Sequence, residues 1–315
     1  MKKMKALLLM LGTVGLAAGF MAGTAHASTP YYTKSINSSV SYIKGHTKKS
    51  ELNCWDALAV KRSPYGMSSA AKKVFVKSLS GQFSDLDGHY AAVDYERTLI
   101  GAVSIGYNPT KYRGKNLVNG MIKTAPKSNA GVLAKVFGII ALSTKNYGSK
   151  SNATVKTLVS QVVKAQDSKG GWEISGHTSD VDVTGMALMA LGMHKNYSGV
   201  NTAISKAVKL LETKAFSKKT GDFVIAGSFS KKANSNSDAL AIAGLSAVGV
   251  NPEKLKTKSG VTPIKRLIKY QKSSGQFRWW MGSNSGSLQM ATQQSAYALE
   301  QYSYFKANKG SIFKF

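Results

Sequence analysis

The chain has 315 residues and is strongly basic, with 43 lysine and arginine residues against 15 aspartate and glutamate residues. One cysteine excludes an intramolecular disulfide framework, and six prolines without a low-complexity linker favour one large domain with a substantial core. The formal net charge of +28 creates a field that attracts polyanions. The basic residues are scattered in pairs and are not gathered with aromatic residues on one element, so we expect no nucleic-acid partner.

Residues 1–27 have the pattern of a signal peptide. Three lysines precede an uncharged run over residues 6–25, and Ala25-His26-Ala27 offers small residues at a cleavage site. An uncleaved anchor helix stays open as an alternative, because the run is about long enough to span a bilayer. We expect cleavage, which leaves a single domain over residues 28–315 without a transmembrane helix.

Export and charge together indicate the partners of the mature chain. Without the three leader lysines, 40 basic residues face 15 acidic ones, a net charge of +25. We therefore expect a secreted protein that associates with the anionic polymers of a cell envelope. A lysine-rich solvated surface without a dedicated partner is the alternative.

Two kinds of apolar pattern alternate along the chain. Amphipathic segments with lysine on the polar face predict helices with one buried stripe, and segments rich in Ala, Gly and Leu predict helices buried on all sides. The amphipathic segments lie near 36–45, 68–79, 114–124, 151–166, 199–214 and 262–272, and the apolar ones near 57–60, 99–105, 132–142, 185–191, 239–248 and 296–299.

Six such pairs indicate a repeat architecture in which each pair buries its core against its neighbours. An open solenoid and a closed ring both fit this pattern. The count of six favours closure, as does the absence of a polar capping repeat at either end. We predict an all-α fold, an (α/α)6 toroid of six outer and six inner helices.

A glycine turn closed by an aromatic residue recurs after the amphipathic segments. It reads Gln166-x-x-x-Gly170-x-Trp172 and, in a second copy, Gln271-x-x-x-Gly275-x-Phe277, while a third copy ending at Phe223 carries an insertion. Glycine permits the sharp reversal, the glutamine amide can tie the helix end to the turn, and the ring can plug the gap.

These turns resemble the Gln-Trp repeats of the squalene cyclases, within the α/α toroids of terpenoid cyclases, protein prenyltransferases and cobalamin carriers. The starts of the apolar segments at Trp55, Asp94, Asp180 and Asn236 are most similar to the toroid domain of exported surface proteins of Gram-positive bacteria. The resemblance spans nearly the whole mature chain. It implies the toroid fold and a ligand site at the starts of the inner helices.

The acids of the Asp180-Val-Asp182-Val183 motif resemble the Asp-x-Asp-Asp motif of squalene-hopene-type cyclases, whose central acid protonates an alkene. Here valine replaces the last acid, which weakens the case for that chemistry. Aspartate at a helix start also caps backbone N–H groups, worth about 0.5–2 kcal/mol. We expect capping, and keep a terpenoid cyclase or isomerase with Asp182 as general acid, beside Asp180, as the alternative.

Other chemistries lack their residues. Cys54 has no histidine at zinc-ligand spacing, and no thioester motif or nucleophile elbow is present. His177 lies near the two acids, but a lone loop histidine is more often solvated. We expect no metal and no cofactor.

With these chemistries set aside, the sequence favours a binding function. We expect a non-enzymatic protein that binds a ligand, a glycan or a protein at the starts of its inner helices. Aromatic rings with a few acids and amides are typical of a ligand cleft. Because adjacent rings cannot both face inward, at least one of Trp279 and Trp280 is expected to be exposed or to line a cavity. The candidate residues are Trp55, Asp94, Tyr95, Asp180, Asp182, Asp238, Trp279, Trp280 and Gln293.

Overall fold

A computed structural model describes residues 29–46, 52–80, 86, 91–127, 131–174, 178–228, 232–282 and 284–315. The expected signal peptide lies outside these residues. Within them the protein is all-helical, with four isolated β-bridges and no named strand. None of the described helices combines the length and the apolar composition that crossing a membrane requires.

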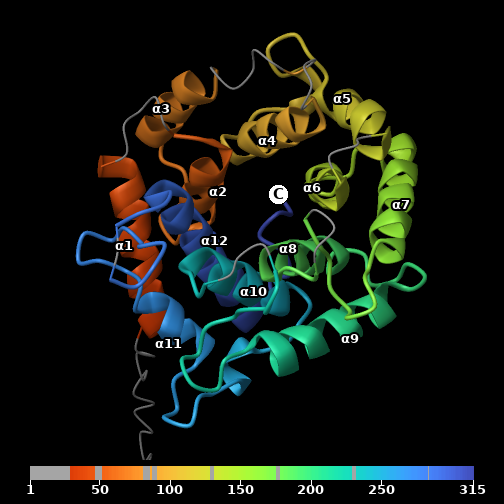
Figure 1. Ribbon diagram of the computed structural model, residues 1–315. Coiled ribbons are helices and arrows are strands. Elements are labelled where there is room, and N and C mark those ends of the chain that lie inside the picture. The colour runs from red at the N-terminus through yellow and green to blue at the C-terminus, as the bar shows by residue number, and fades with distance from the viewer. Residues whose placement is uncertain are drawn as a thin grey trace, which may run out of the picture.

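Twelve α-helices of the described residues alternate between an outer and an inner ring, as predicted (Figure 1). The outer helices are α1 (Tyr31–His46), α3 (Ser69–Leu79), α5 (Leu117–Thr124), α7 (Ser149–Lys164), α9 (Val200–Leu210) and α11 (Pro263–Ile268). The inner helices are α2 (Cys54–Arg62), α4 (Ala91–Ser104), α6 (Gly131–Leu142), α8 (Val181–Leu191), α10 (Ser235–Ala247) and α12 (Leu288–Lys306).

The inner ring is closed. Each inner helix packs against the next one along the chain, and α12 packs against both α1 and α2. Glycine allows the closest of these approaches, because a Cβ atom on Gly185 of α8 would lie 2.3 Å from the carbonyl oxygen of Leu240 in α10. The prediction of a closed (α/α)6 toroid is therefore confirmed.

The glycine turns join neighbouring outer helices. The side-chain amide of Gln166 donates to the carbonyl oxygens of Gly170 and of Ala203 in α9, at 2.9 and 2.8 Å. The Gln271 amide donates to the carbonyl oxygen of Ser35 in α1, at 2.9 Å. Since α1 is the first outer helix and Gln271 follows the last, this second copy closes the outer ring.

Aromatic residues of the turns fill the space between the two rings. Trp172, Phe223 and Phe277 are each completely buried, and the indole Nε1 of Trp172 donates to the carbonyl oxygen of Val162 at 2.7 Å. The insertion in the third copy follows a turn of π-helix, Leu211–Ala215, at the end of α9. A π-turn absorbs an extra residue without ending the helix.

The two ends of the ring differ. At the end where the inner helices finish, the tail after α12 turns back into the ring, and the C-terminus lies at its centre (Figure 1). Ile312 and Phe313 of this tail are buried among the inner helices. The end where the inner helices begin carries the loops that follow the glycine turns.

Candidate functional site

Side-chain caps start four of the inner helices: α2, α8, α10 and α12. Asp180 caps α8, where its Oδ1 accepts from the backbone N–H groups of Asp182 and Val183 at 2.8 and 3.3 Å. Asn53, Asn234 and Ser287 cap α2, α10 and α12 in the same way. Asp180 is thus a structural residue at the start of α8.

Asp238 lies deeper than a helix cap. Its Oδ1 accepts a hydrogen bond from the backbone N–H of Phe223 at 2.7 Å. In the other two copies, the hydroxyl groups of Thr184 and Thr292 accept the corresponding hydrogen bonds from the backbone N–H groups of Trp172 and Phe277. Its side chain is fully buried. Asp238 therefore joins a glycine turn to α10.

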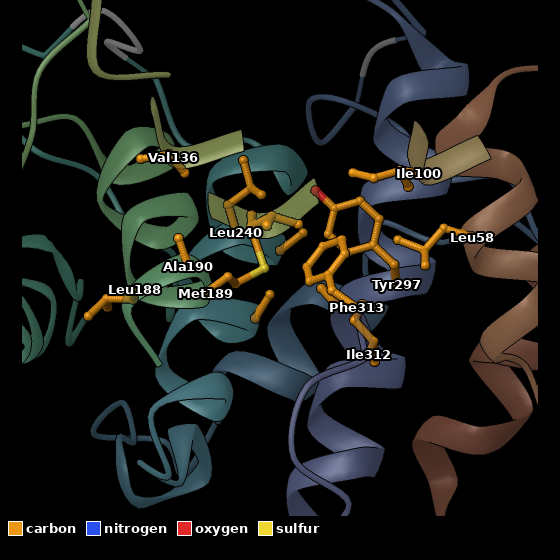
Figure 2. Packing of buried hydrophobic residues seen from close by; sticks show 14 of the residues in the cluster. Leu58, Ile100, Val136, Leu188, Met189, Ala190, Leu240, Tyr297, Ile312 and Phe313 are labelled. Atoms are coloured by element: carbon orange, nitrogen blue, oxygen red, sulfur yellow. The ribbon is translucent and has the colours of Figure 1, made fainter. Parts of the chain in front are cut away.

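Helical periodicity sorts the inward-facing side chains into levels. Residues four and seven positions apart share one face of a helix, so Asp182, Met186 and Met189 form a column on α8. Glu96 lies one turn before Ile100 on α4, and Gln293 one turn before Tyr297 on α12. Figure 2 shows Ile100, Met189 and Tyr297 meeting at the centre of the ring.

At and below this level the ring is packed with apolar side chains. Leu58, Ile100, Met189, Ile312 and Phe313 are all buried there (Figure 2). Above it, several side chains are only partly buried: Trp55, Phe137, Asp182 and Met186. These four side chains keep some contact with solvent, whereas the side chains below them form an apolar core.

Trp55 forms the aromatic layer between these two parts. Its ring lies 5.7 Å from that of Phe137, 5.8 Å from that of Tyr297 and 6.4 Å from that of Phe313, centroid to centroid. The four rings come from α2, α6, α12 and the C-terminal tail. Their faces provide a surface that attracts cations and apolar groups.

In the described part of the chain, several inner helices carry a buried side-chain oxygen without a partner, and on α4, α8 and α12 such a side chain lies one or two turns above the apolar centre. Both carboxyl oxygens of Glu96, Oδ1 of Asp182 and Oε1 of Gln293 have no hydrogen-bond partner among the described residues. Such orphaned atoms cost free energy, and native structures usually satisfy them with water or a ligand. The level of Glu96, Asp182 and Gln293 is the candidate site.

The pKa of the Asp182 carboxyl group lies near neutral pH. Burial raises the pKa of its carboxyl group to about 7, and the negative charge of Asp180 adds to this effect, while hydrogen bonding with Ser237 opposes it. The side chain follows the cap and does not itself bind the helix start. Capping therefore explains Asp180, whereas the contact of the Asp182 side chain is its hydrogen bond with Ser237 of α10.

Glu96 and Tyr297 belong to the site but were not among the sequence candidates. Burial raises the pKa of Glu96 to about 8, with Arg97 opposing the shift and Asp94 adding to it. The pKa of Tyr297 is raised by burial, and the charges of Asp182 and Glu96 contribute. The signal in the sequence was an acid one turn before Ile100 on an otherwise apolar helix face.

The structure distributes the other candidates around the rim. Asp94 is half-buried beside Glu96. Tyr95 points outward, because a Cβ atom on Gly120 of α5 would lie 2.1 Å from its ring, and it lines a cavity of about 360 Å3 there. It is therefore separate from the level of Asp182.

The two adjacent tryptophans stack on each other. The rings of Trp279 and Trp280 lie 4.7 Å apart and nearly parallel, both half-buried, and Lys232 Nζ lies 4.9 Å from the ring of Trp280. The backbone N–H of Ser235, in the first turn of α10, donates to the Trp279 carbonyl oxygen at 3.0 Å. This pair lies at the start of α10, on the rim of the ring.

Within the part of the chain that is described, no three His, Cys, Asp or Glu side chains gather closely enough to bind a metal ion. Cys54 is buried at the start of α2. His177 lies outside the described residues. The chemistry of the candidate site therefore rests on carboxyl groups, an amide and aromatic rings.

Solved structures share this fold. The type II terpene cyclase MstE from Scytonema matches 87% of this chain and 99% of its own, with a TM-score of 0.59 and 10% sequence identity, and a variant in complex with the substrate geranylgeranyl dihydroxybenzoate matches equally well. The ent-copalyl diphosphate synthase from Streptomyces platensis matches 85% of this chain and 50% of its own, with a TM-score of 0.54 and 12% identity. No protein-family model and no curated protein matches the sequence. The chain has the α/α toroid fold of the terpenoid cyclases.

Proposed function

We propose that the toroid is an acid-initiated cyclase or isomerase that acts on an isoprenoid, with Asp182 as the proton donor. The observation that carries this proposal is the state of the Asp182 carboxyl group. Its pKa is raised to about 7, so about half of the groups carry the proton at neutral pH. The carboxyl group has a buried oxygen without a partner among the described residues and lies above a layer of aromatic rings. A general acid needs a pKa near the working pH.

The reaction would begin when the Asp182 carboxyl group gives its proton to a carbon–carbon double bond. The carbocation that forms is stabilised by the negative faces of Trp55, Phe137 and Tyr297. Loss of a proton from carbon to the Asp182 carboxylate completes an isomerisation or a cyclisation and restores the acid. No net oxidant, reductant or metal is required.

Val183 does not prevent this chemistry. It is buried at the helix start, where a third acid would stand in the Asp-x-Asp-Asp motif. The raised pKa of Asp182 comes first from burial and second from Asp180, and both causes are present without a third acid. The fold shared with terpene cyclases supports the same assignment only at the level of architecture.

Deuterium incorporation tests the proposal. The protein is incubated in D2O with geraniol, farnesol, geranylgeraniol and their diphosphates, and the products are analysed by mass spectrometry. We expect a product that carries one solvent deuterium on carbon. Asp182→Asn should abolish it while leaving the helical circular dichroism spectrum intact, and Glu212→Gln on the outer ring should not change it. Products without deuterium, or full activity in Asp182→Asn, would refute the assignment.

A binding protein is the second candidate, and the stacked Trp279–Trp280 pair favours it. Half-buried parallel rings beside Lys232 suit a flat apolar ligand or the face of a sugar. Trp279→Ala and Trp280→Ala should then weaken binding of envelope glycans at least tenfold, with Asp182→Asn binding as the wild type does. Equal binding by all variants would exclude this surface.

Export and attachment to a cell envelope remain part of the proposal. The lysine-rich start followed by an uncharged run supports export, and the mature charge of +25 supports attachment to anionic polymers. Attachment by charge weakens as salt screens the interaction. Salt should therefore release the mature protein from isolated cell walls, and retention in 1 M NaCl would contradict the charge account.

A further inference from the structure

The C-terminal tail is fixed inside the ring by hydrogen bonds to two inner helices. Gln301 of α12 donates to the carbonyl oxygen of Gly310 at 2.9 Å and accepts from the backbone N–H of Ile312 at 3.0 Å. Arg62, at the end of α2, donates to the carbonyl oxygens of Ile312 and Lys314. The tail is thus a defined part of the ring.

A third inner helix holds the end of the tail. The backbone N–H of Phe315 donates to the carbonyl oxygen of Thr144, just after α6, at 2.9 Å. The Arg62 guanidinium lies 3.8 Å from the centre of the Phe315 ring. The Phe315 side chain is only half-buried, and the hydrogen bond to Thr144 is made by its backbone, which an alanine would keep.

Phe313, by contrast, points into the ring. Its side chain is 1% exposed, lies beside Tyr297, and meets the ring of Trp55 edge-on at 6.4 Å (Figure 2). Protein interiors are close-packed, so removing this ring would leave a void directly below Trp55. Phe313 is therefore the member of the aromatic layer that packs beneath Trp55.

The depth above Phe313 is short. Asp182 lies seven residues before Met189 on the same face of α8, which is about 10 Å along the helix axis. Met189 is buried at the level of Phe313 and Tyr297, whereas Asp182 and Met186 are partly exposed (Figure 2). A long prenyl chain that presents a double bond to Asp182 would run into this packed core.

We infer that Phe313 is the floor of the site and sets the length of the isoprenoid that it accepts. The inference rests on the proposed function and deepens it: the substrate is a short prenyl compound, with its length limited by a residue of the tail. Removing the Phe313 ring extends the site toward Ile312, so the variant should accept chains longer by one prenyl unit or more.

Chain-length selection tests the inference. Binding of geraniol, farnesol and geranylgeraniol is measured by calorimetry for the wild type, Phe313→Ala, Phe313→Leu and the control Phe315→Ala. The control loses an aromatic ring from the same tail without opening the interior. We expect the wild type to favour geraniol, and the ratio of geranylgeraniol to geraniol affinity to rise at least tenfold in Phe313→Ala, less in Phe313→Leu, and not in Phe315→Ala.

The outcomes separate this inference from the proposed function. If the wild type incorporates deuterium but Phe313→Ala and Phe313→Leu keep its chain-length order, the floor is elsewhere and only the inference fails. If the wild type neither binds these alcohols nor forms a deuterated product, both fail. Because Phe313→Leu preserves most of the buried volume, it gives a result even if Phe313→Ala does not fold.

Discussion

Asp180 Oδ1 accepts a hydrogen bond from the backbone N–H of Asp182 at 2.8 Å. This contact divides the acid pair into two roles. Asp180 completes the start of α8, and its negative charge helps to keep the neighbouring carboxyl group protonated. Asp182 projects into the ring one level above Met186. A cap and a proton donor therefore lie two residues apart on one helix.

Replacing Asp180 by asparagine should separate these roles. Asparagine caps as well as aspartate does, so the melting temperature should change little. The nearby negative charge is lost, so the pKa of Asp182 should fall below about 7 toward its ordinary value. Carbon-13 NMR of the labelled carboxyl groups measures this pKa. An unchanged pKa would show that burial alone keeps Asp182 protonated.

The contact between the turn after α11 and helix α1, which closes the outer ring and is called the seam below, is expected to depend on Gln271. Its amide makes hydrogen bonds to Ser35, Ser39 and Gly275, and its Oε1 accepts from Ser35 Oγ at 2.7 Å. Gln166 makes two such bonds. At about 1 kcal/mol for each net bond, Gln271→Ala should destabilise the fold more than Gln166→Ala in urea unfolding. The reverse order would argue that the outer ring does not need this closure.

Stability should be greatest at mildly acidic pH. Burial raises the pKa of Asp182 to about 7 and that of Glu96 to about 8, so the folded chain keeps protons that the unfolded chain releases above about pH 4. The free energy of unfolding therefore falls as the pH rises from about 4 to about 8, by up to about 1.4 kcal/mol for each unit of pKa shift. Melting temperatures at pH 5 and pH 8.5 measure the effect.

Two substitutions should reduce this pH dependence, and one ion pair should act in the opposite direction at low pH. Asp182→Asn and Glu96→Gln should each flatten the decline above pH 5. In the other direction, burial of Asp222 is outweighed by hydrogen bonds from Arg266, Thr220 and Tyr270, which lower its pKa, so its contribution is lost as the pH falls below about 4. A melting temperature that rises steadily from pH 5 to pH 8.5 would contradict the raised carboxyl pKa values.

The fold could be predicted from the sequence because the helical periodicity, the spacing of the repeats and the turn residues all indicate the same architecture. The alternation of polar-faced and apolar segments placed all twelve helices, and Gln166 and Gln271 fell at equivalent points of two pairs. The glycine turns carry their own chemistry, since Gly170 and Gly275 have φ values of 94° and 92°. Periodicity and turn chemistry are local properties, so they can be read from one chain.

The site could be predicted only in part, because it depends on which face of each inner helix meets the ring axis. Asp182 and Gln293 were found from their places near helix starts. Glu96 could not be identified from the sequence, because it follows Asp94 and Tyr95 directly and only the folded helix shows that Glu96 shares a buried face with Ile100. Phe313 was missed because a tail of this length gives no periodicity, and only the folded ring brings it under Trp55.

Gly275 offers a sharper test of ring closure than the amide beside it. A Cβ atom at this position would lie 2.1 Å from the carbonyl oxygen of Ser38 in α1, which no backbone can accommodate without moving. Gly260 is the matched control, since its φ of 78° is also left-handed but a Cβ atom would meet nothing within 4 Å. Gly260→Ala should cost only the left-handed strain, about 1–2 kcal/mol. Gly275→Ala should cost clearly more and should increase hydrogen exchange in α1, because α1 must separate from the turn. Equal losses in the two variants would mean that α1 is free to shift and that the seam contributes little to the stability of the toroid.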